Sequence, residues 1–247
     1  MYEGIVGSNR VALKVMPVSD RHTVSELVCY QRLAGYSHDN VINAHLAVVS
    51  HDGNAVALPL ELAGCDLMAA CSRAGGFEEF EAARIFSQVL AGVAFLHENG
   101  IYHLDLKPEN IMMCGRHASR CAVPQIADFG TSAICPRGSS MVSQSCGTQV
   151  YACPEGVRWN EARRRRERQA PPSSKSSPHL PALPPSPKST CPEGAASSAA
   201  SRASDASSQS RSSITLDVAS ECMPYDAAKA DVWALGVSLF SVVTGVC

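Results

Sequence analysis

The sequence predicts an α+β fold of two lobes, a small antiparallel sheet with one helix followed by a larger, mainly helical part. Three observations predict it. Short β-rich runs bounded by turn residues fill residues 1–62. Within residues 63–247, apolar residues recur at helical spacing at Ala82–Leu96 and form a long, nearly continuous run at Val232–Val246. An abrupt change of composition at about residues 157–222 separates those two helices and marks an insertion within the second lobe.

The first lobe begins with a predicted strand at Val11–Val15. Two further β-rich stretches, Ala44–Ser50 and Asn54–Leu62, are joined by Asp52-Gly53, a dipeptide that suits a tight hairpin turn. Between the first strand and this hairpin, apolar residues fall near helical spacing and predict one helix. They are Val24, Leu27, Val28 and Leu33.

The second lobe contains an amphipathic helix that stops at Asn99-Gly100. Its apolar residues recur every three or four positions: Ala82, Ile85, Phe86, Val89, Leu90, Val93 and Leu96. A second helix, Val232–Val246, is apolar on nearly all sides and predicts a buried central helix that needs neighbours to cover it. It is shorter than the roughly 20 residues that span a bilayer, so we expect no contact with a membrane.

The insertion combines a basic cluster, Arg163–Arg168, with the proline-rich run Pro181–Pro187 and a Ser/Ala tract at Ala195–Ser213. This composition has too little apolar content to offset the entropy of ordering, so we expect disorder. The basic cluster fits a nuclear-import signal, a contact for an acidic partner, or simply a solvated run of charge. An adaptor function carried by the insertion is one hypothesis for the chain.

Overall charge and cysteine content narrow the classes of partner and compartment. A formal net charge of −2 over 247 residues removes the basic excess with which nucleic-acid binders contact phosphates, so we expect no nucleic-acid partner. The 11 cysteines form no Cys-x-x-Cys pair of the kind that structural zinc requires. Their odd number, without an N-terminal signal pattern, favours reduced thiols in the cytoplasm or nucleus.

Five motifs occur in a fixed order along the chain. They are Val-Ala-Leu-Lys ending at Lys14, His103–Asn110, Asp128-Phe129-Gly130, Gly147–Glu155 and Asp231–Gly236. Together they resemble the eukaryotic protein kinases, which implies that kinase-like fold for the two lobes. The Asp-Leu-Lys-Pro-Glu-Asn pattern around Lys107 resembles the serine/threonine branch rather than the tyrosine branch.

The resemblance implies phosphoryl transfer from ATP to a hydroxyl of a protein substrate, with Mg²⁺ as the metal. Asp105 would accept or orient the proton of the substrate hydroxyl, and Lys107 would contact the transferred phosphate. Asn110 and Asp128 would hold Mg²⁺ against the nucleotide phosphates. Lys14 would contact the α- and β-phosphates.

The resemblance also implies where adenine would bind. The ring would lie between Ala12 above and Met112 below, with Leu60 as the gatekeeper. The hinge between the lobes would fall near Glu61-Leu62-Ala63. These apolar residues also satisfy the simpler interpretation that they belong to the core.

Lys14 needs a helix carboxylate to hold it, and Glu26 is the acidic residue suitably placed before the hairpin. The interval between the two is shorter than is usual in the family, and Ala34-Gly35-Tyr36 looks like extra sequence. An exposed helix charge is the alternative for Glu26. His103 and Phe129 resemble members of the family's internal hydrophobic spine, and Tyr30 is a further candidate.

Several departures from the family pattern limit the functional prediction. Leu104 stands where many kinases carry an arginine that binds a phosphorylated activation loop, and leucine offers no charge. Cys153 replaces the usual alanine. Gly4 and Gly7 form no Gly-x-Gly-x-x-Gly loop and are expected in turns. The glycine-rich loop and the helices that normally follow the central helix are missing, so we expect an incomplete catalytic domain.

These departures leave an alternative open, a pseudokinase or kinase-like binding module without phosphotransfer activity. The residues that argue against it are Lys14, Asp105, Asn110 and Asp128, since a binding module has no physical need for both metal ligands. The leading hypothesis is therefore an ATP-dependent protein serine/threonine kinase.

Overall fold

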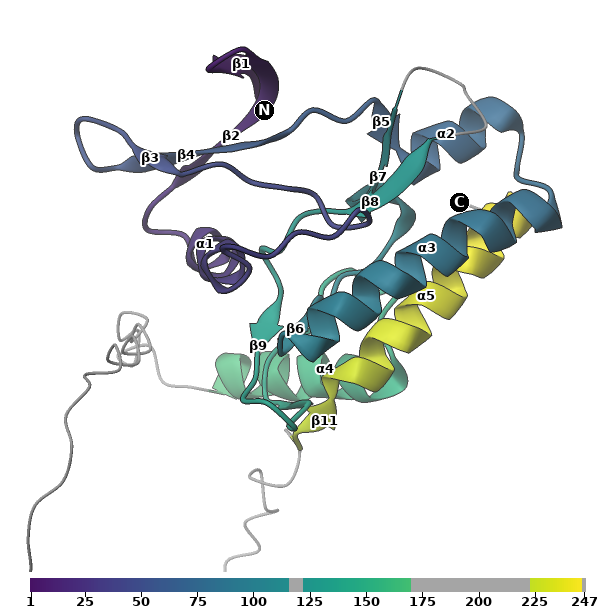
Figure 1. Cartoon of the computed structure of the whole chain (residues 1–247). Helices are drawn as coiled ribbons and strands as arrows, with labels where there is room; N and C mark the ends of the chain where they lie inside the picture. The colour runs from purple at the N-terminus through teal and green to yellow at the C-terminus, as the bar shows by residue number, and fades with distance from the viewer. Residues whose placement is uncertain (116–121, 170–222, 246–247) are drawn as a thin grey trace, which may run out of the picture.

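The computed structural model describes residues 1–115, 122–169 and 223–245, which form a sheet lobe above a helical lobe (Figure 1). The upper lobe is a four-stranded antiparallel sheet of order β1-β2-β4-β3. Its strands are β1 (Tyr2–Val6), β2 (Asn9–Pro17), β3 (Val48–Val49) and β4 (Ala55–Glu61). Helix α1 (Arg21–Arg32) follows β2. This confirms the α+β class expected from the sequence.

Side-chain alternation along β4 explains how the sheet packs. Val56, Leu58 and Leu60 occupy every second position and are at most 3% exposed, so one face of the strand is buried. They pack with Met16 and Ile42, and Leu27 and Tyr30 of α1 border the same cluster. The expected hairpin is present, although paired β3 is shorter than predicted.

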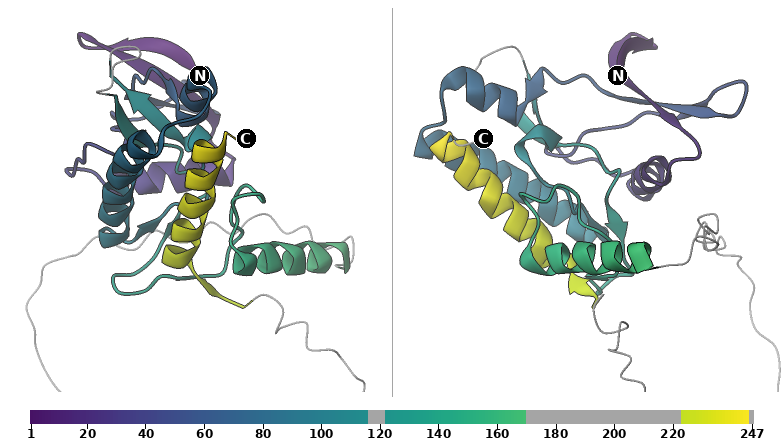
Figure 2. Two further views of the ribbon diagram at one scale, coloured as in Figure 1. Left: turned by 90° about the vertical axis from the view of Figure 1, so that its right-hand side faces the viewer. Right: turned by 180° about the vertical axis from the view of Figure 1, so that it is seen from behind.

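The lower lobe is built on two long helices, α3 (Glu79–Glu98) and α5 (Ala227–Thr244), which lie side by side (Figures 1 and 2). Helix α2 (Leu67–Ala74) contacts a small sheet of β5 (Cys65–Asp66), β7 (Ile111–Cys114) and β8 (Val123–Ile126), and β8 packs against α3. The remaining short elements are β6 (Ile101–Tyr102), paired with β9 (Ala133–Ile134), the 3₁₀ turn η1 (Pro108–Asn110), β10 (Met141–Val142), paired with β11 (Tyr225–Asp226), and α4 (Pro154–Gln169).

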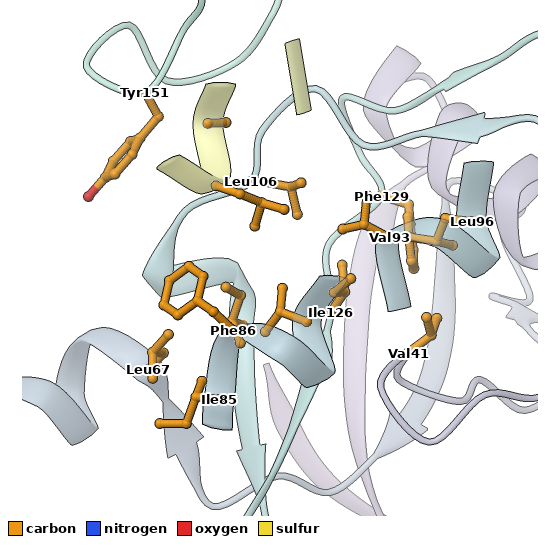
Figure 3. Packing of buried hydrophobic residues seen from close by; sticks show 14 of the residues in the cluster. Val41, Leu67, Ile85, Phe86, Val93, Leu96, Leu106, Ile126, Phe129 and Tyr151 are labelled. Atoms are coloured by element: carbon orange, nitrogen blue, oxygen red, sulfur yellow. The ribbon is translucent and has the colours of Figure 1, made fainter. Parts of the chain in front are cut away.

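The main core confirms the helix predicted from apolar spacing. Ile85, Phe86, Val89 and Val93 of α3 are buried and pack against Leu106 of the loop before η1. Figure 3 shows several of these side chains gathered between α3 and the neighbouring segments. The catalytic-type motif thus lies directly on the core of the lower lobe.

Helix α4 corrects one sequence prediction. Residues 157–169, which we expected to be disordered, continue a helix that starts at Pro154, and the basic cluster Arg163–Arg168 lies on it. Arginine, glutamate and alanine have high helix propensity, so a composition typical of disorder also suits an exposed helix. The far end of α4 projects away from α5 (Figure 2). The rest of the predicted insertion, residues 170–222, lies outside the described residues.

Glycine placement corrects a second prediction. Gly7 lies in the β1–β2 turn with φ of 61°, as expected. Gly4 instead lies inside β1, opposite Val11. A Cβ atom at Gly4 would lie 2.5 Å from Leu13 Cδ1, so a larger residue at this strand position would have to displace the Leu13 side chain.

Helix α5 has one buried and one exposed face. Asp231, Leu235 and Val242 are at most 4% exposed, whereas Trp233 is 48% and Phe240 is 65% exposed. The sequence predicted a helix that needs neighbours to cover it, and within the described residues Trp233 and Phe240 remain uncovered. By length and composition α5 is apolar enough to cross a membrane, with a mean hydropathy of 1.3. Its buried aspartate and core contacts match a core helix, and the absence of membrane contact stays a prediction.

Candidate active site

The loop that carries His103–Asn110 is fixed from below by a buried carboxylate of α5. Asp231 accepts hydrogen bonds from the backbone N–H of His103 at 2.9 Å and of Leu104 at 2.7 Å. Its Oδ2 also lies 2.8 Å from His97 Nε2. Leu104 has a positive φ of 62°, a conformation that leucine rarely adopts. Two hydrogen bonds to one carboxylate hold the loop in this strained turn, and the same carboxylate contacts His97 of α3.

Three of the expected site residues converge at the start of this loop. Asp105 Oδ2 accepts from Lys107 Nζ at 3.1 Å, and Asn110 Nδ2 donates to Asp105 O at 2.8 Å. Asp105 Oδ1 accepts from the backbone N–H of Thr148 at 2.7 Å. Thr148 Oγ1 in turn accepts from Lys107 Nζ at 2.7 Å. The carboxylate therefore has a fixed orientation, with the lysine ammonium beside it.

Thr148 is a residue to which sequence reasoning gave no role. It belongs to the motif Gly147–Glu155, so its position in that motif was the available signal. Its neighbour Gly147 is required by close approach, because a Cβ atom there would lie 2.3 Å from the Asp105 carboxyl group. The segment around residue 148 therefore closes directly over the catalytic-type aspartate.

A second group of charges joins the two lobes. Lys14 Nζ lies 2.7 Å from Glu26 Oε2 and 2.9 Å from Asp128 Oδ1, so the predicted Lys14–Glu26 pair is present. The Glu26 side chain is 1% exposed and that of Asp128 is 50% exposed. Burial alone would lower the pKa of Lys14, but the two carboxylates outweigh it and raise that pKa. Lys14 is therefore held as a cation.

Asp128 keeps its negative charge for a related reason. Burial alone would raise the pKa of this carboxyl, and the charge and hydrogen bond of Lys14 outweigh it, so the pKa is lowered. The residue has a positive φ of 67°, which aspartate tolerates better than most side chains. The N–H of Gly130 donates to its Oδ1 at 3.3 Å. An ionised carboxylate is thus presented at the boundary of the lobes.

Helix α1 is tied to the segment after Asp128. Ser25 Oγ donates to Ser132 O at 2.8 Å, and His22 Nδ1 lies 2.8 Å from Gly130 O. Phe129 is fully buried, and its ring lies edge-on to Tyr30 at 5.2 Å. The ring centroid of His103 lies 5.4 Å from that of Phe129. The three residues expected in a hydrophobic spine are therefore connected by ring contacts through Phe129.

The residues expected around adenine come from both lobes. Ala12 and Leu60 pair across β2 and β4, and Met112 of β7 borders the same apolar cluster. Glu61 Oε2 accepts from Gln125 Nε2 at 3.3 Å, so its carboxylate is turned toward β8. Leu62, the next residue, is 40% exposed. The structure thus places Ala12 and Met112 beside one apolar cluster and leaves Leu62 partly exposed.

A cavity of about 700 Å³ lies elsewhere, behind α1, where Tyr30, Tyr36, His38 and Phe95 are among the lining residues. None of Lys14, Asp105 and Asp128 lines it. The chemistry-bearing side chains and this cavity are therefore separate features.

The donor set fits a hard divalent cation. Asn110 Nδ2 donates both of its hydrogen bonds to Asp105, which leaves the amide oxygen for a cation. Asp128 offers an ionised, half-exposed carboxylate. The described residues hold no group of three or more His, Cys, Asp or Glu side chains that could bind a metal. Mg²⁺ is usually held by one or two protein oxygens together with substrate phosphates, and Asn110 and Asp128 match that pattern.

Comparison with known proteins agrees with this geometry. Residues 5–168 match the family model described as "Protein kinase domain". The chain is 35% identical over 118 residues, 48% of its length, to "CBL-interacting protein kinase 8" of Oryza sativa subsp. japonica. It is 34% identical over 139 residues, 56% of its length, to "Probable serine/threonine-protein kinase fhkD" of Dictyostelium discoideum. These matches span 25% and 18% of the two relatives, so the chain corresponds to a minor part of each.

Proposed function

The chain belongs to the protein kinase family, and we propose that it is a serine/threonine protein kinase that transfers the γ-phosphate of ATP to hydroxyl groups of protein substrates. The observation that carries the proposal is the orientation of Asp105 by Thr148 and Lys107. A carboxylate fixed in this way next to an ammonium group suits a substrate hydroxyl and the phosphate that it attacks.

Each side chain of the site has a role that follows from its contacts. Asp105 would orient the substrate hydroxyl and take up its proton, because positioned proton transfer is the part of the reaction that a carboxylate can supply. Lys107 would neutralise the transferred phosphate, and Lys14 the α- and β-phosphates. Asn110 and Asp128 would hold Mg²⁺, which when bound neutralises phosphate charge and orients the nucleotide.

The following observations support serine and threonine, rather than tyrosine, as the substrate residues, and support the proposed cellular compartment. Lys107 is in hydrogen-bonding contact with Thr148, and it belongs to the motif that resembles the serine/threonine branch. Three of the similar proteins are named as serine/threonine-protein kinases. No disulfide joins the cysteines of the described residues, and reduced thiols are usual in the cytoplasm or nucleus. We propose that the chain acts there on protein substrates, without nucleic acid or membrane.

The test is phosphotransfer by the purified full chain from labelled ATP and Mg²⁺ to serine/threonine and to tyrosine peptide libraries. Asp105→Asn is the test variant and Asp39→Asn, at an exposed position, is the matched control. We expect transfer to serine and threonine only, with turnover about 10²- to 10⁴-fold lower in Asp105→Asn. Nucleotide affinity should change little, because the contact of Asp105 is made to the hydroxyl.

The alternative of a kinase-like binding module gives a different result in the same assay. Wild-type protein and Asp105→Asn would then show equal background transfer, while both bound nucleotide. That outcome would remove the proposed activity and keep the family membership.

A further inference from the structure

Two buried cysteines lie close together in the segment that closes over the catalytic loop. Cys146 is 6% and Cys153 is 5% exposed, and both belong to an apolar cluster that also contains Leu104. Cys153 stands where the resemblance to the kinases places alanine. The sulfur at this position is therefore a feature of this chain rather than of the family pattern.

Gly156 shows how close the two sulfurs are. A Cβ atom built on Gly156 would lie 2.3 Å from Cys146 Sγ and 3.4 Å from Cys153 Sγ. The sulfurs are therefore at most 5.7 Å apart, the sum of these two distances. A disulfide needs an S–S distance of about 2 Å, so a shift of less than about 4 Å would join them. The missing side chain at Gly156 is what leaves room for both thiols.

Polar hydrogens surround this pair of sulfurs. The N–H of Gly156 donates to Cys153 Sγ at 3.3 Å, and Asn160 Nδ2 lies 3.8 Å from Cys146 Sγ. Burial nevertheless raises the pKa of both thiols. The reactive form is the thiolate, so we expect oxidation to be slow while the segment is closed and to proceed when it opens.

We propose that Cys146 and Cys153 form an oxidation site whose intramolecular disulfide switches off phosphotransfer by displacing the segment that seats Asp105. The activity half of this proposal rests on the proposed kinase function, whereas the formation of the disulfide does not.

The chemistry balances with a peroxide as the two-electron oxidant. One thiolate attacks a peroxide oxygen, the O–O bond breaks, and a sulfenic acid and hydroxide form; the hydroxide takes up the proton that the thiol released and becomes water. The second sulfur then attacks the sulfenic sulfur, the S–O bond breaks, and a second water leaves with the remaining thiol proton. Two thiols are oxidised to a disulfide and one hydrogen peroxide is reduced to two waters.

The disulfide would act on the active site through the next two residues. The N–H of Gly147 donates to Leu104 O at 2.9 Å, and the N–H of Thr148 donates to Asp105 Oδ1 at 2.7 Å. Gly147 has no free space on the side of Asp105. A shift of Cys146 therefore moves the two residues that orient the carboxylate, and misplacement of about 1 Å can cost about 10²-fold in rate.

The sequence provides a direct assay. Trypsin cuts after Arg137 and Arg158 and releases a peptide that contains Cys146, Cys153 and no other cysteine. The preceding peptide, Cys121–Arg137, contains two other cysteines and serves as an internal control. The full chain is treated with hydrogen peroxide, alkylated and digested with trypsin, and the peptide masses are measured by mass spectrometry. We expect peptide 138–158 to lose two hydrogen atoms and take up no alkyl group, and dithiothreitol to restore double alkylation.

Variants connect the disulfide to activity. Cys153→Ala should keep phosphotransfer and lose its sensitivity to peroxide, whereas Cys135→Ala, from the same cluster, should stay as sensitive as wild type. In wild type we expect a loss of about 10- to 100-fold that dithiothreitol reverses.

Each half of the proposal fails separately. Full alkylation of both cysteines in peptide 138–158 after peroxide treatment would overturn the oxidation site, and that result needs no folded variant. A disulfide without loss of phosphotransfer would overturn the switch. A reduced chain with no phosphotransfer at all would instead remove the proposed kinase function, while the peptide mass still decides on the disulfide.

Discussion

The two groups of polar residues that form the candidate active site are held in different ways. Asp105 is oriented mainly by the backbone of its surroundings, with the N–H of Thr148 and the loop fixed by Asp231. Asp128 and Glu26 are instead joined through one flexible side chain, that of Lys14. The first group lies within the lower lobe, whereas the second crosses between the lobes.

This difference indicates where the site is rigid and where it depends on lobe position. Backbone donors on a packed loop cannot leave their acceptor without disturbing the core below Leu106. The ion pair of Lys14 and Glu26 requires α1 to stay next to the sheet, while Ser25 and His22 tie α1 to the segment after Asp128. Substitutions in the two groups should therefore differ in what they change.

Among the changes that test this comparison, the largest effect is expected from Asp128→Asn, which removes the carboxylate of the interlobe group. Turnover should fall by about 10³-fold, because the charge that would hold the metal is lost. Folding should persist, since asparagine also tolerates the positive φ of 67° at this position. Kinetics and thermal unfolding measured on the same samples check both statements. Wild-type turnover in the variant would show that Asp128 is not a metal ligand.

The orientation of Asp105 in the first, rigid group is disturbed most directly by Gly147→Ala. The added methyl group would lie 2.3 Å from the Asp105 carboxyl, so the segment must move away from the carboxylate. We expect kcat to fall about 10- to 100-fold with little change in KM for ATP.

Gly236→Ala in α5 is the matched control for this substitution, because nothing lies within 4 Å of the added atom. It should leave kcat unchanged and stabilise the helix by up to about 1 kcal/mol. Equal kinetics of the Gly147 and Gly236 variants would contradict a rigid Asp105 group.

A smaller effect is expected from Glu26→Gln, which tests the group that is joined through the flexible side chain of Lys14. Lys14 would lose one carboxylate and keep Asp128 at 2.9 Å, so its ammonium stays in the site with less restraint. Turnover should fall about tenfold, less than for Asp128→Asn, and KM for ATP should rise. Glu98→Gln, at the end of α3 and away from Lys14, is the control. An effect as large as that of Asp128→Asn would mean that α1 carries more of the site than the contacts show.

The smallest effect is expected from phosphatase treatment of the full chain. Leu104 is 5% exposed in an apolar cluster with Tyr102, Val142 and Tyr225, so it has no charge with which to bind a phosphate. The segment is held instead by β10–β11 pairing and by the hydrogen bond from Tyr225 Oη to Gln144 O at 3.1 Å. Turnover should therefore change by less than about twofold. A large loss after dephosphorylation would show that another cation reads a phosphate in this segment.

Local patterns in the sequence were sufficient to predict most of the individual helices and strands. The apolar spacing from Ala82 to Leu96 predicted α3, and the Asp52-Gly53 turn predicted the hairpin, because each depends on residues close together in the chain. The ordered motifs were sufficient for the family and for the partner of Lys14. The composition of residues 157–169 predicted disorder wrongly, because exposed helices and disordered segments are both rich in charged residues. The burial of Ala162 and the packing of Trp159, which distinguish the helix from a disordered segment, appear only in the tertiary structure.

The sequence by itself determined which groups carry chemistry, from Lys14 to Asp128, and that they belong to a kinase fold. Only the tertiary structure decided what holds them. Asp231 reaches the amides of His103 and Leu104 from a helix more than 100 positions away in the chain, and Thr148 closes over Asp105. The approach of Cys146 and Cys153 likewise depends on space left at Gly156. Periodicity reports burial along one segment, whereas contacts between segments arise only when those segments pack.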